Sequence, residues 1–217
     1  MSDQRIVSPH RGQSVRVAGE PLASARAAML MLHGRGARAE DILSLANEFN
    51  QPEFAYLAPQ AAGNTWYPNR FLAPIEENEP WLSSALELVG DVLEQIGAAG
   101  IPHERTILLG FSQGACLTLE FAARNAGRYG GVVGLSGALI GPEDMPRDYD
   151  GSLDDTPVFL GCSDVDFHVP KERVHETADV MRRLGGDVTE RLYPNMGHTV
   201  NQDEIDLVRG MMKRVMQ

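Results

Sequence analysis

Short apolar segments alternate with longer amphipathic segments along most of the chain. The short segments predict buried β-strands, and they cover residues 27–32, 54–59, 105–111, 130–137, 157–162 and 188–194. The longer segments repeat their apolar residues with a helical period, and they cover residues 39–49, 81–100, 113–127, 171–186 and 203–216. Residues 14–19 predict an additional edge strand. This alternation predicts an α/β fold, with a mostly parallel sheet of about seven strands and helices on both faces.

The chain is long enough for one sizeable core, since it has 217 residues and 43% of them are hydrophobic. No linker separates two parts, so we expect a single domain over residues 1–217. Two long loops remain, at 59–80 and 138–156. Ligands of open parallel sheets bind beyond the carboxyl ends of the strands, so reactive residues there are the candidates for function.

The pentapeptide Gly110-Phe111-Ser112-Gln113-Gly114 matches the pattern G-x-S-x-G. It lies between a predicted strand and a helix that is apolar on nearly all sides. In this context the pattern is typical of a nucleophile elbow, a sharp turn that exposes a serine beside the positive end of a helix. A glycine-rich turn with an idle serine is the alternative. We therefore predict that Ser112 is a nucleophile.

A serine nucleophile needs a base, and the base needs a carboxylate that orients it. The next two strand ends supply both residue types. Asp164 and Asp166 follow the strand 157–162, and His198 follows the strand 188–194. Parallel strands end at the same edge of the sheet, so Ser112, one of the two aspartates and His198 can meet there.

Five other histidines fit the role of base less well. His10 and His103 fall in loops on the wrong side of strands, and His168 is too near the aspartates to be oriented by them. His175 lies in a helix that shields the sheet. His33 precedes the serine and must have another role.

Acyl transfer through a tetrahedral intermediate also needs backbone N–H groups that point at the developing oxyanion. One should belong to Gln113, directly after the nucleophile. The other should come from the loop after the first buried strand, which reads "LHGRGA" over residues 32–37. Glycines at 34 and 36 would let the amide of Arg35 face the pocket.

Taken together, "LHGRG", "GFSQG", "DFHVP" and "MGHTV" occur in an order that resembles the phospholipase/carboxylesterase family of α/β-hydrolases. The resemblance covers nearly the whole chain. It implies an α/β-hydrolase fold, Ser112 as nucleophile, His198 as base, and Arg35 and Gln113 as oxyanion donors. It also makes Asp166 the acid, because the family's aspartate stands three residues before the valine of Val-Pro. A homodimer is common in this family.

The chain departs from the family pattern at two places. The residues at 37–39 are "ARA" where the family often has Gly-Asp-Thr, and Phe167 follows the acid where proline is frequent. The segment 65–80 is more similar to the bacterial esterase-like branch than to the acyl-protein thioesterases. The resemblance therefore implies a serine carboxylesterase for small to medium esters, with an acyl thioesterase or lysophospholipase as the alternative. A non-catalytic binding module on a hydrolase fold and a serine peptidase are weaker alternatives.

Apolar residues in the two long loops predict the walls of the substrate pocket. Trp66, Tyr67, Phe71 and Leu72 come from the loop 59–80, and Leu139 follows the strand 130–137. Such residues supply area for an acyl or aromatic group. The alternative is that they only attach a long loop to the body of the protein.

Charge narrows the choice of partners. The net charge is −11, which disfavours binding to nucleic acid or anionic lipid. No apolar segment is long enough to span a membrane, and the first ten residues lack the apolar core of a signal peptide, so we expect a cytoplasmic protein.

The expected reaction needs no cofactor. We expect no metal, since the acidic stretch 141–155 lacks calcium-ligand spacing and Cys116 and Cys162 form no metal motif.

Overall fold

The computed structural model describes residues 8–217. Its seven strands form one sheet in the order β1-β3-β2-β4-β5-β6-β7. β1 runs antiparallel to its neighbour, and all other neighbouring pairs are parallel. The strands are β1 (Val15–Gly19), β2 (Ala27–Leu32), β3 (Phe54–Pro59), β4 (Thr106–Phe111), β5 (Gly131–Leu135), β6 (Pro157–Ser163) and β7 (Asp187–Tyr193). The predicted α/β class and the predicted edge strand are confirmed, and the structure shows that this strand is antiparallel to its neighbour.

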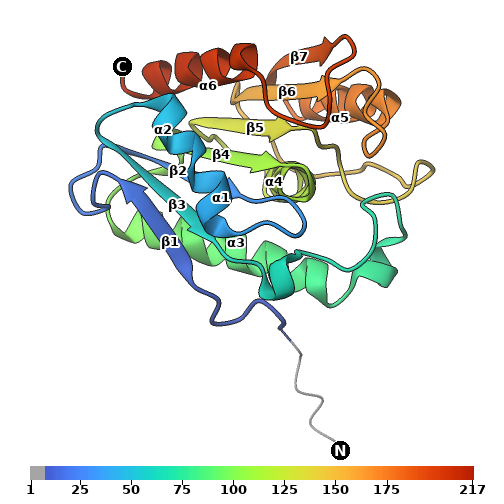
Figure 1. Cartoon of the computed structure of the whole chain (residues 1–217), viewed down its shortest axis with the longest axis horizontal. Coiled ribbons are helices and arrows are strands. Elements are labelled where there is room, and N and C mark those ends of the chain that lie inside the picture. Colours follow the sequence, from blue (N-terminus) through green and yellow to red (C-terminus); the bar gives the residue numbers. More distant parts are fainter. Residues whose placement is uncertain (1–7) are drawn as a thin grey trace, which may run out of the picture.

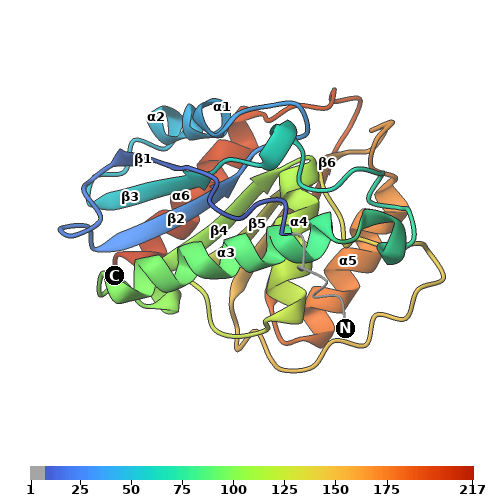
Figure 2. The same ribbon diagram turned by 90° about the horizontal axis from the view of Figure 1, so that it is seen from below.

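Helices cover both faces of the sheet (Figures 1 and 2). The helices are α1 (Ala39–Leu43), α2 (Leu45–Phe49), α3 (Trp81–Ala98), α4 (Gln113–Arg124), α5 (Lys171–Arg183) and α6 (Gln202–Val215). Helices α1, α2 and α6 pack on one face, whereas α3, α4 and α5 pack on the other. Three short 3₁₀ turns, η1 (Ala62–Asn64), η2 (Ile75–Asn78) and η3 (His103–Arg105), lie in the connections.

Each central strand contributes side chains to both cores. In β2, Leu30 and Leu32 belong to the core under α3 and α4, whereas Met29 and Met31 belong to the core under α1 and α6. Successive side chains of a strand point to opposite faces, so a strand covered on both faces must be apolar at every position. This explains the uninterrupted sequence "AAMLML".

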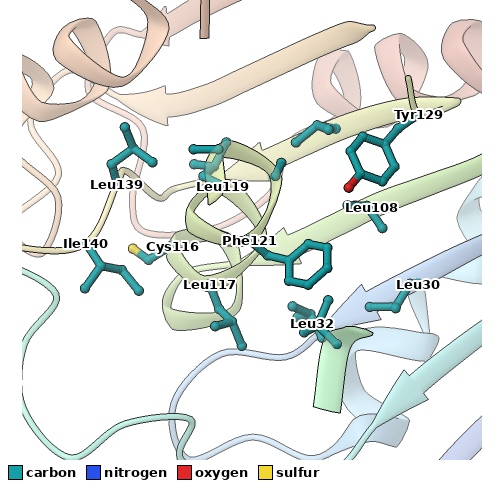
Figure 3. Packing of buried hydrophobic residues seen from close by; sticks show 14 of the residues in the cluster. Leu30, Leu32, Leu108, Cys116, Leu117, Leu119, Phe121, Tyr129, Leu139 and Ile140 are labelled. Atoms are coloured by element: carbon teal, nitrogen blue, oxygen red, sulfur yellow. The ribbon is translucent and has the colours of Figure 1, made fainter. Parts of the chain in front are cut away.

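Helix α4 is the central helix of its layer. Its residues 113–123 are all buried, as its apolar sequence predicts. Figure 3 shows Leu117, Leu119 and Phe121 of this helix within the same cluster as Leu108 of β4. Burial on all sides fixes α4 against the sheet, and with it the residue that precedes the helix.

The predicted helix at 39–49 is divided into α1 and α2 at Ser44. The hydroxyl of Ser44 donates a hydrogen bond of 2.7 Å to the carbonyl oxygen of Asp41. A serine that bonds to the preceding turn competes with the helical pattern and often bends it, which apolar periodicity alone does not reveal.

The prediction of a cytoplasmic location rested on the first ten residues, and seven of them lie outside the described part of the chain. Between residues 8 and 217, no helix combines the length and the apolar character needed to cross a lipid bilayer.

Candidate active site

Ser112 occupies the turn between β4 and α4 with φ 55° and ψ −120°. Positive φ is unfavourable for a residue with a side chain, so this turn is strained. Two backbone hydrogen bonds hold it: the N–H of Ser112 donates to the carbonyl of Leu135 at 2.9 Å, and the carbonyl of Ser112 accepts from the N–H of Cys116 at 3.0 Å. The side chain is thereby presented at the carboxyl end of β4.

The two glycines of the pentapeptide are required by close contacts. A Cβ atom on Gly110 would lie 2.2 Å from the carbonyl oxygen of Gly114, and one on Gly114 would lie 2.1 Å from the carbonyl oxygen of Leu32. Both distances are far below van der Waals contact with backbone atoms that cannot move freely. The turn therefore brings strand and helix closer than any side chain allows.

The structure brings Ser112, His198 and Asp166 together at one edge of the sheet. The hydroxyl of Ser112 lies 2.8 Å from Nε2 of His198, and Nδ1 of His198 lies 2.6 Å from Oδ2 of Asp166. The carboxylate is an acceptor, so it requires a proton on Nδ1 and leaves the lone pair of Nε2 toward the serine hydroxyl. The side chain of Asp166 is fully buried and that of His198 is 16% exposed.

The two candidate aspartates have different partners. Besides His198, Asp166 accepts the backbone N–H groups of His168 at 2.8 Å and Val169 at 3.1 Å. Asp164 instead accepts the N–H of Asn195 at 2.8 Å. Burial by itself raises the pKa of Asp166, but the hydrogen bonds from His198 and the two amides outweigh it, so the pKa is lowered. Asp166 is therefore the carboxylate that orients His198, and Asp164 links two loops.

The amide nitrogens of Arg35 and Gln113 remain available for a ligand. Neither donates a hydrogen bond to another group within residues 8–217. Gln113 is the first residue of the twelve-residue helix α4, whose N-terminal N–H groups have no partner within the helix. Both residues line the same pocket as Ser112. This arrangement fits the predicted pair of oxyanion donors.

The side chains of these two residues hold the loop 59–80 in place. The guanidinium of Arg35 donates to the carbonyl oxygens of Tyr67, Pro68 and Asn69. The side-chain amide of Gln113 accepts the N–H of Trp66 at 3.0 Å and donates to the carbonyl of Tyr67 at 2.8 Å. The sequence analysis did not predict these bonds, because they depend on which backbone groups of a long loop face the site.

Two buried histidines attach the same loop from its other side. Nε2 of His33 accepts the N–H of Ala61 at 3.1 Å, and Nδ1 of His10 accepts the N–H of Ala62 at 3.1 Å. Burial lowers the pKa of both imidazoles, which keeps them neutral and able to accept. His33 thus has the separate role that its position implied, and His10 belongs to the support of the site.

The pocket beside Ser112 has a volume of about 610 Å³. Tyr67 and Phe71 line it, as predicted. Residues that the sequence analysis did not assign to the pocket also line it, among them Phe111, Cys116, His168 and Val169. Cys116 lies one helical turn after Ser112 and faces the same side of α4, a spacing that the sequence does contain.

Three predicted pocket residues do not line this pocket. Trp66 is fully buried behind it, where its indole N–H donates to the carbonyl of His33 at 2.8 Å. Leu139 is buried in the core beneath α4 and α5, with its N–H bonded to the hydroxyl of Thr177. Leu72 packs against the same core. These three residues attach the loops to the body, which was the alternative interpretation.

Similarity to known proteins agrees with this geometry. The profile of the family described as phospholipase/carboxylesterase matches residues 15–215. The chain belongs to this family. One similar solved structure is the crystal structure of a phospholipase/carboxylesterase from Dyadobacter fermentans DSM 18053. Its sequence is 43% identical, the match covers 95% of this chain and 97% of that chain, and the TM-score is 0.89. The α/β-hydrolase fold is thereby established.

Curated relatives within the family have two kinds of name. Acyl-protein thioesterase 1 of Gibberella zeae is 33% identical over 57% of this chain, and the match spans 54% of that protein. A similar match to Acyl-protein thioesterase 1 of Debaryomyces hansenii spans 50% of its length, so the chain matches about half of these two relatives. A probable carboxylesterase of Oryza sativa subsp. japonica is 25% identical over 95% of this chain and 85% of its own length. Membership of this family shows that the chain is a hydrolase. The names of the relatives do not decide whether its substrate is an ester or an acyl thioester.

Glu204, which is fully buried, supports the loop that carries His198. Oε2 of Glu204 accepts the N–H of Asn201 at 2.8 Å, and Oδ1 of Asn201 accepts the N–H of Glu204 at 3.0 Å. This capping box fixes the start of α6, directly after the loop. Oε1 of Glu204 has no partner in the described chain. Burial raises the pKa of Glu204 to about 7.

The contacts of Gly114 predict a large loss of stability for Gly114→Ala, because the new methyl group would collide with the backbone of β2. We expect the free energy of unfolding, measured by urea denaturation, to fall by about 1–3 kcal/mol or more. Gly210→Ala is the matched control. It lies within α6 with no atom within 4 Å of the added Cβ, so alanine there should stabilise by up to about 1 kcal/mol. Equal effects of the two substitutions would contradict the steric argument.

The pKa of Glu204 predicts stability that depends on pH. Its pKa of about 7 in the fold exceeds the ordinary value of 4.5, so the folded state binds the proton more tightly and this group contributes less stability as pH rises from about 5 to 7. Glu204→Gln keeps the acceptor for Asn201 but cannot ionise. We expect the variant to be more stable than the wild type at pH 8, by on the order of 2 kcal/mol, and the difference to shrink toward pH 4.5. Unfolding in urea at both pH values measures it, and a difference independent of pH would be inconsistent with a buried ionised carboxylate.

Proposed function

We propose that this protein is a serine carboxylesterase that hydrolyses small to medium carboxylic esters through an acyl-enzyme. The observation that carries the proposal is the unbroken chain of hydrogen bonds from Ser112 through His198 to Asp166, at the wall of a pocket of about 610 Å³. Nucleophile, base and orienting carboxylate have the mutual geometry that acyl transfer needs. Membership of a family whose description names phospholipases and carboxylesterases supports the same chemistry.

In the first step, Nε2 of His198 takes the proton of Ser112 while the hydroxyl oxygen attacks the acyl carbon. Asp166 accepts the Nδ1 hydrogen bond throughout, which holds the imidazole in the reactive tautomer and stabilises its cationic form. Two amides bonded to Asp166 keep the carboxylate ionised when the imidazole is neutral.

The tetrahedral intermediate places a negative charge on the former carbonyl oxygen. The amides of Arg35 and Gln113 would donate to this oxyanion, assisted by the positive end of α4. His198 then gives its proton to the leaving alcohol, and the acyl group remains on Ser112. A water molecule, activated by His198, hydrolyses the acyl-enzyme along the same path. The proposed steps require only protein groups and water.

Acyl thioester hydrolysis is the second candidate, because several curated relatives have the name acyl-protein thioesterase 1. Both reactions pass through the same tetrahedral intermediate, so the hydrogen-bonded chain serves either. Rates on matched oxygen esters and thioesters of the same acyl chain distinguish them. A thioester-to-oxygen-ester ratio of kcat/KM that exceeds the ratio of their hydroxide hydrolysis rates would favour the thioesterase.

We expect Ser112→Ala to abolish ester hydrolysis, with kcat reduced by at least about 10⁴-fold. The change removes one oxygen at a partly exposed position, so the melting temperature should stay nearly unchanged. Hydrolysis of p-nitrophenyl esters and labelling by a fluorophosphonate probe measure the loss. Substantial activity in a folded variant would rule out Ser112 as the nucleophile.

Asp166→Asn should reduce kcat/KM far more than Asp164→Asn. An amide at 166 can present its NH₂ group to Nδ1 of His198 and favour the wrong tautomer, at a cost of about 10³–10⁴-fold. Asparagine at 164 keeps an oxygen for the N–H of Asn195, so we expect less than about a tenfold effect. The two isosteric variants control for each other, and the reverse ranking would move the acid to Asp164.

A further inference from the structure

The wall of the pocket is basic in a protein that is otherwise acidic. The chain has 30 acidic and 19 basic residues, excluding histidine. Yet the residues that line the pocket include Arg35, Arg70, His168 and His198, and none of the described lining residues is an aspartate or glutamate. Asp166 lies behind His198 with its side chain fully buried. The local charge that a substrate meets therefore differs in sign from that of the molecule as a whole.

The two arginines of the pocket differ in their partners. The guanidinium of Arg35 is bonded to three loop carbonyls, so it has a structural role. Arg70 is exposed, and its guanidinium forms no hydrogen bond or ion pair with any residue from 8 to 217. Among the described residues, it is thus the pocket arginine whose guanidinium donors have no protein partner.

The backbone beneath Arg70 is nevertheless firmly held. Asn78 is fully buried, and its side chain accepts the N–H of Asn69 at 2.9 Å and donates to the carbonyl of Arg70 at 3.3 Å. The carbonyl of the next residue, Phe71, accepts the N–H of Gly141 at 2.7 Å. A fixed backbone lowers the entropy that is lost when the side chain binds a charged group.

We propose that Arg70 selects esters that carry a carboxylate near the scissile bond. This inference rests on the proposed esterase function and specifies its substrate class. The guanidinium group binds a carboxylate through two parallel hydrogen bonds. One unpaired arginine matches one negative charge, and no acidic lining residue opposes it.

Two matched pairs of esters test the proposal. The first pair places the charge on the alcohol side: 4-acetoxybenzoate against its neutral amide, 4-acetoxybenzamide. The second places it on the acyl side: monomethyl glutarate against the methyl ester of glutaramic acid. Each kcat/KM is divided by the rate constant for hydroxide hydrolysis, which removes differences in intrinsic reactivity. We expect the wild type to favour the anionic member about tenfold in at least one pair, and the preference to fall as NaCl is raised.

Arg70→Gln should bring this ratio close to one, and Arg70→Lys should retain part of it, because lysine keeps the charge and loses the two-pronged geometry. Arg105→Gln is the matched control. It removes the same charge from an exposed residue before β4, whereas Ser112 follows β4, so the ratio should stay at its wild-type value.

The outcomes separate the two proposals. Hydrolysis of the neutral esters with no anionic preference in either pair would overturn the role of Arg70 and leave the esterase intact. A preference that persists in Arg70→Gln, or that falls equally in Arg105→Gln, would also overturn it. Failure of folded wild-type protein to hydrolyse any of the four esters would instead argue against the proposed function.

Discussion

The strained turn at Ser112 is the constraint on which the rest of the site depends. A residue with positive φ costs on the order of 1–3 kcal/mol unless its neighbours impose the conformation. Here both neighbours are held by their packing: β4 pairs with β2 and β5 in the middle of the sheet, and residues 113–123 of α4 are all buried. The glycines at 110 and 114 let these two elements approach until backbone contacts backbone. The serine is the residue left at the apex.

The position of β4 also determines where the other site residues come from. Strands β2, β4, β6 and β7 are parallel, so the residues that follow them emerge at one edge of the sheet. The loop after β2 carries Arg35, the loop after β6 carries Asp166, and the loop after β7 carries His198. Residues that are 86 positions apart can therefore share a hydrogen bond. Sheet topology, rather than proximity in the sequence, assembles the site.

The dependence of the site on sheet topology explains which parts of it could be predicted from the sequence. The sequence reveals strand ends as apolar segments followed by polar residues. The meeting of Ser112, His198 and an aspartate at one sheet edge could therefore be predicted. The choice between Asp164 and Asp166 needed the family resemblance. The pocket walls were harder, because apolar composition does not distinguish a side chain that faces a cavity from one that faces the core. Trp66 is an example: its buried indole bonds the carbonyl of His33, and its neighbour Tyr67 lines the pocket.

The loop 59–80 shows why this distinction matters for function. Bonds from Arg35 and Gln113 hold it on the side of the site, and bonds from His10 and His33 hold it on the other. Several of these bonds are buried, and breaking any one without a substitute partner costs on the order of 1–3 kcal/mol. These bonds hold the loop from both sides as a wall of the site. We therefore expect the shape and charge of this wall to govern selectivity. In particular, we expect side chains such as that of Arg70, whose backbone is held and whose guanidinium has no partner in the described chain, to discriminate between esters.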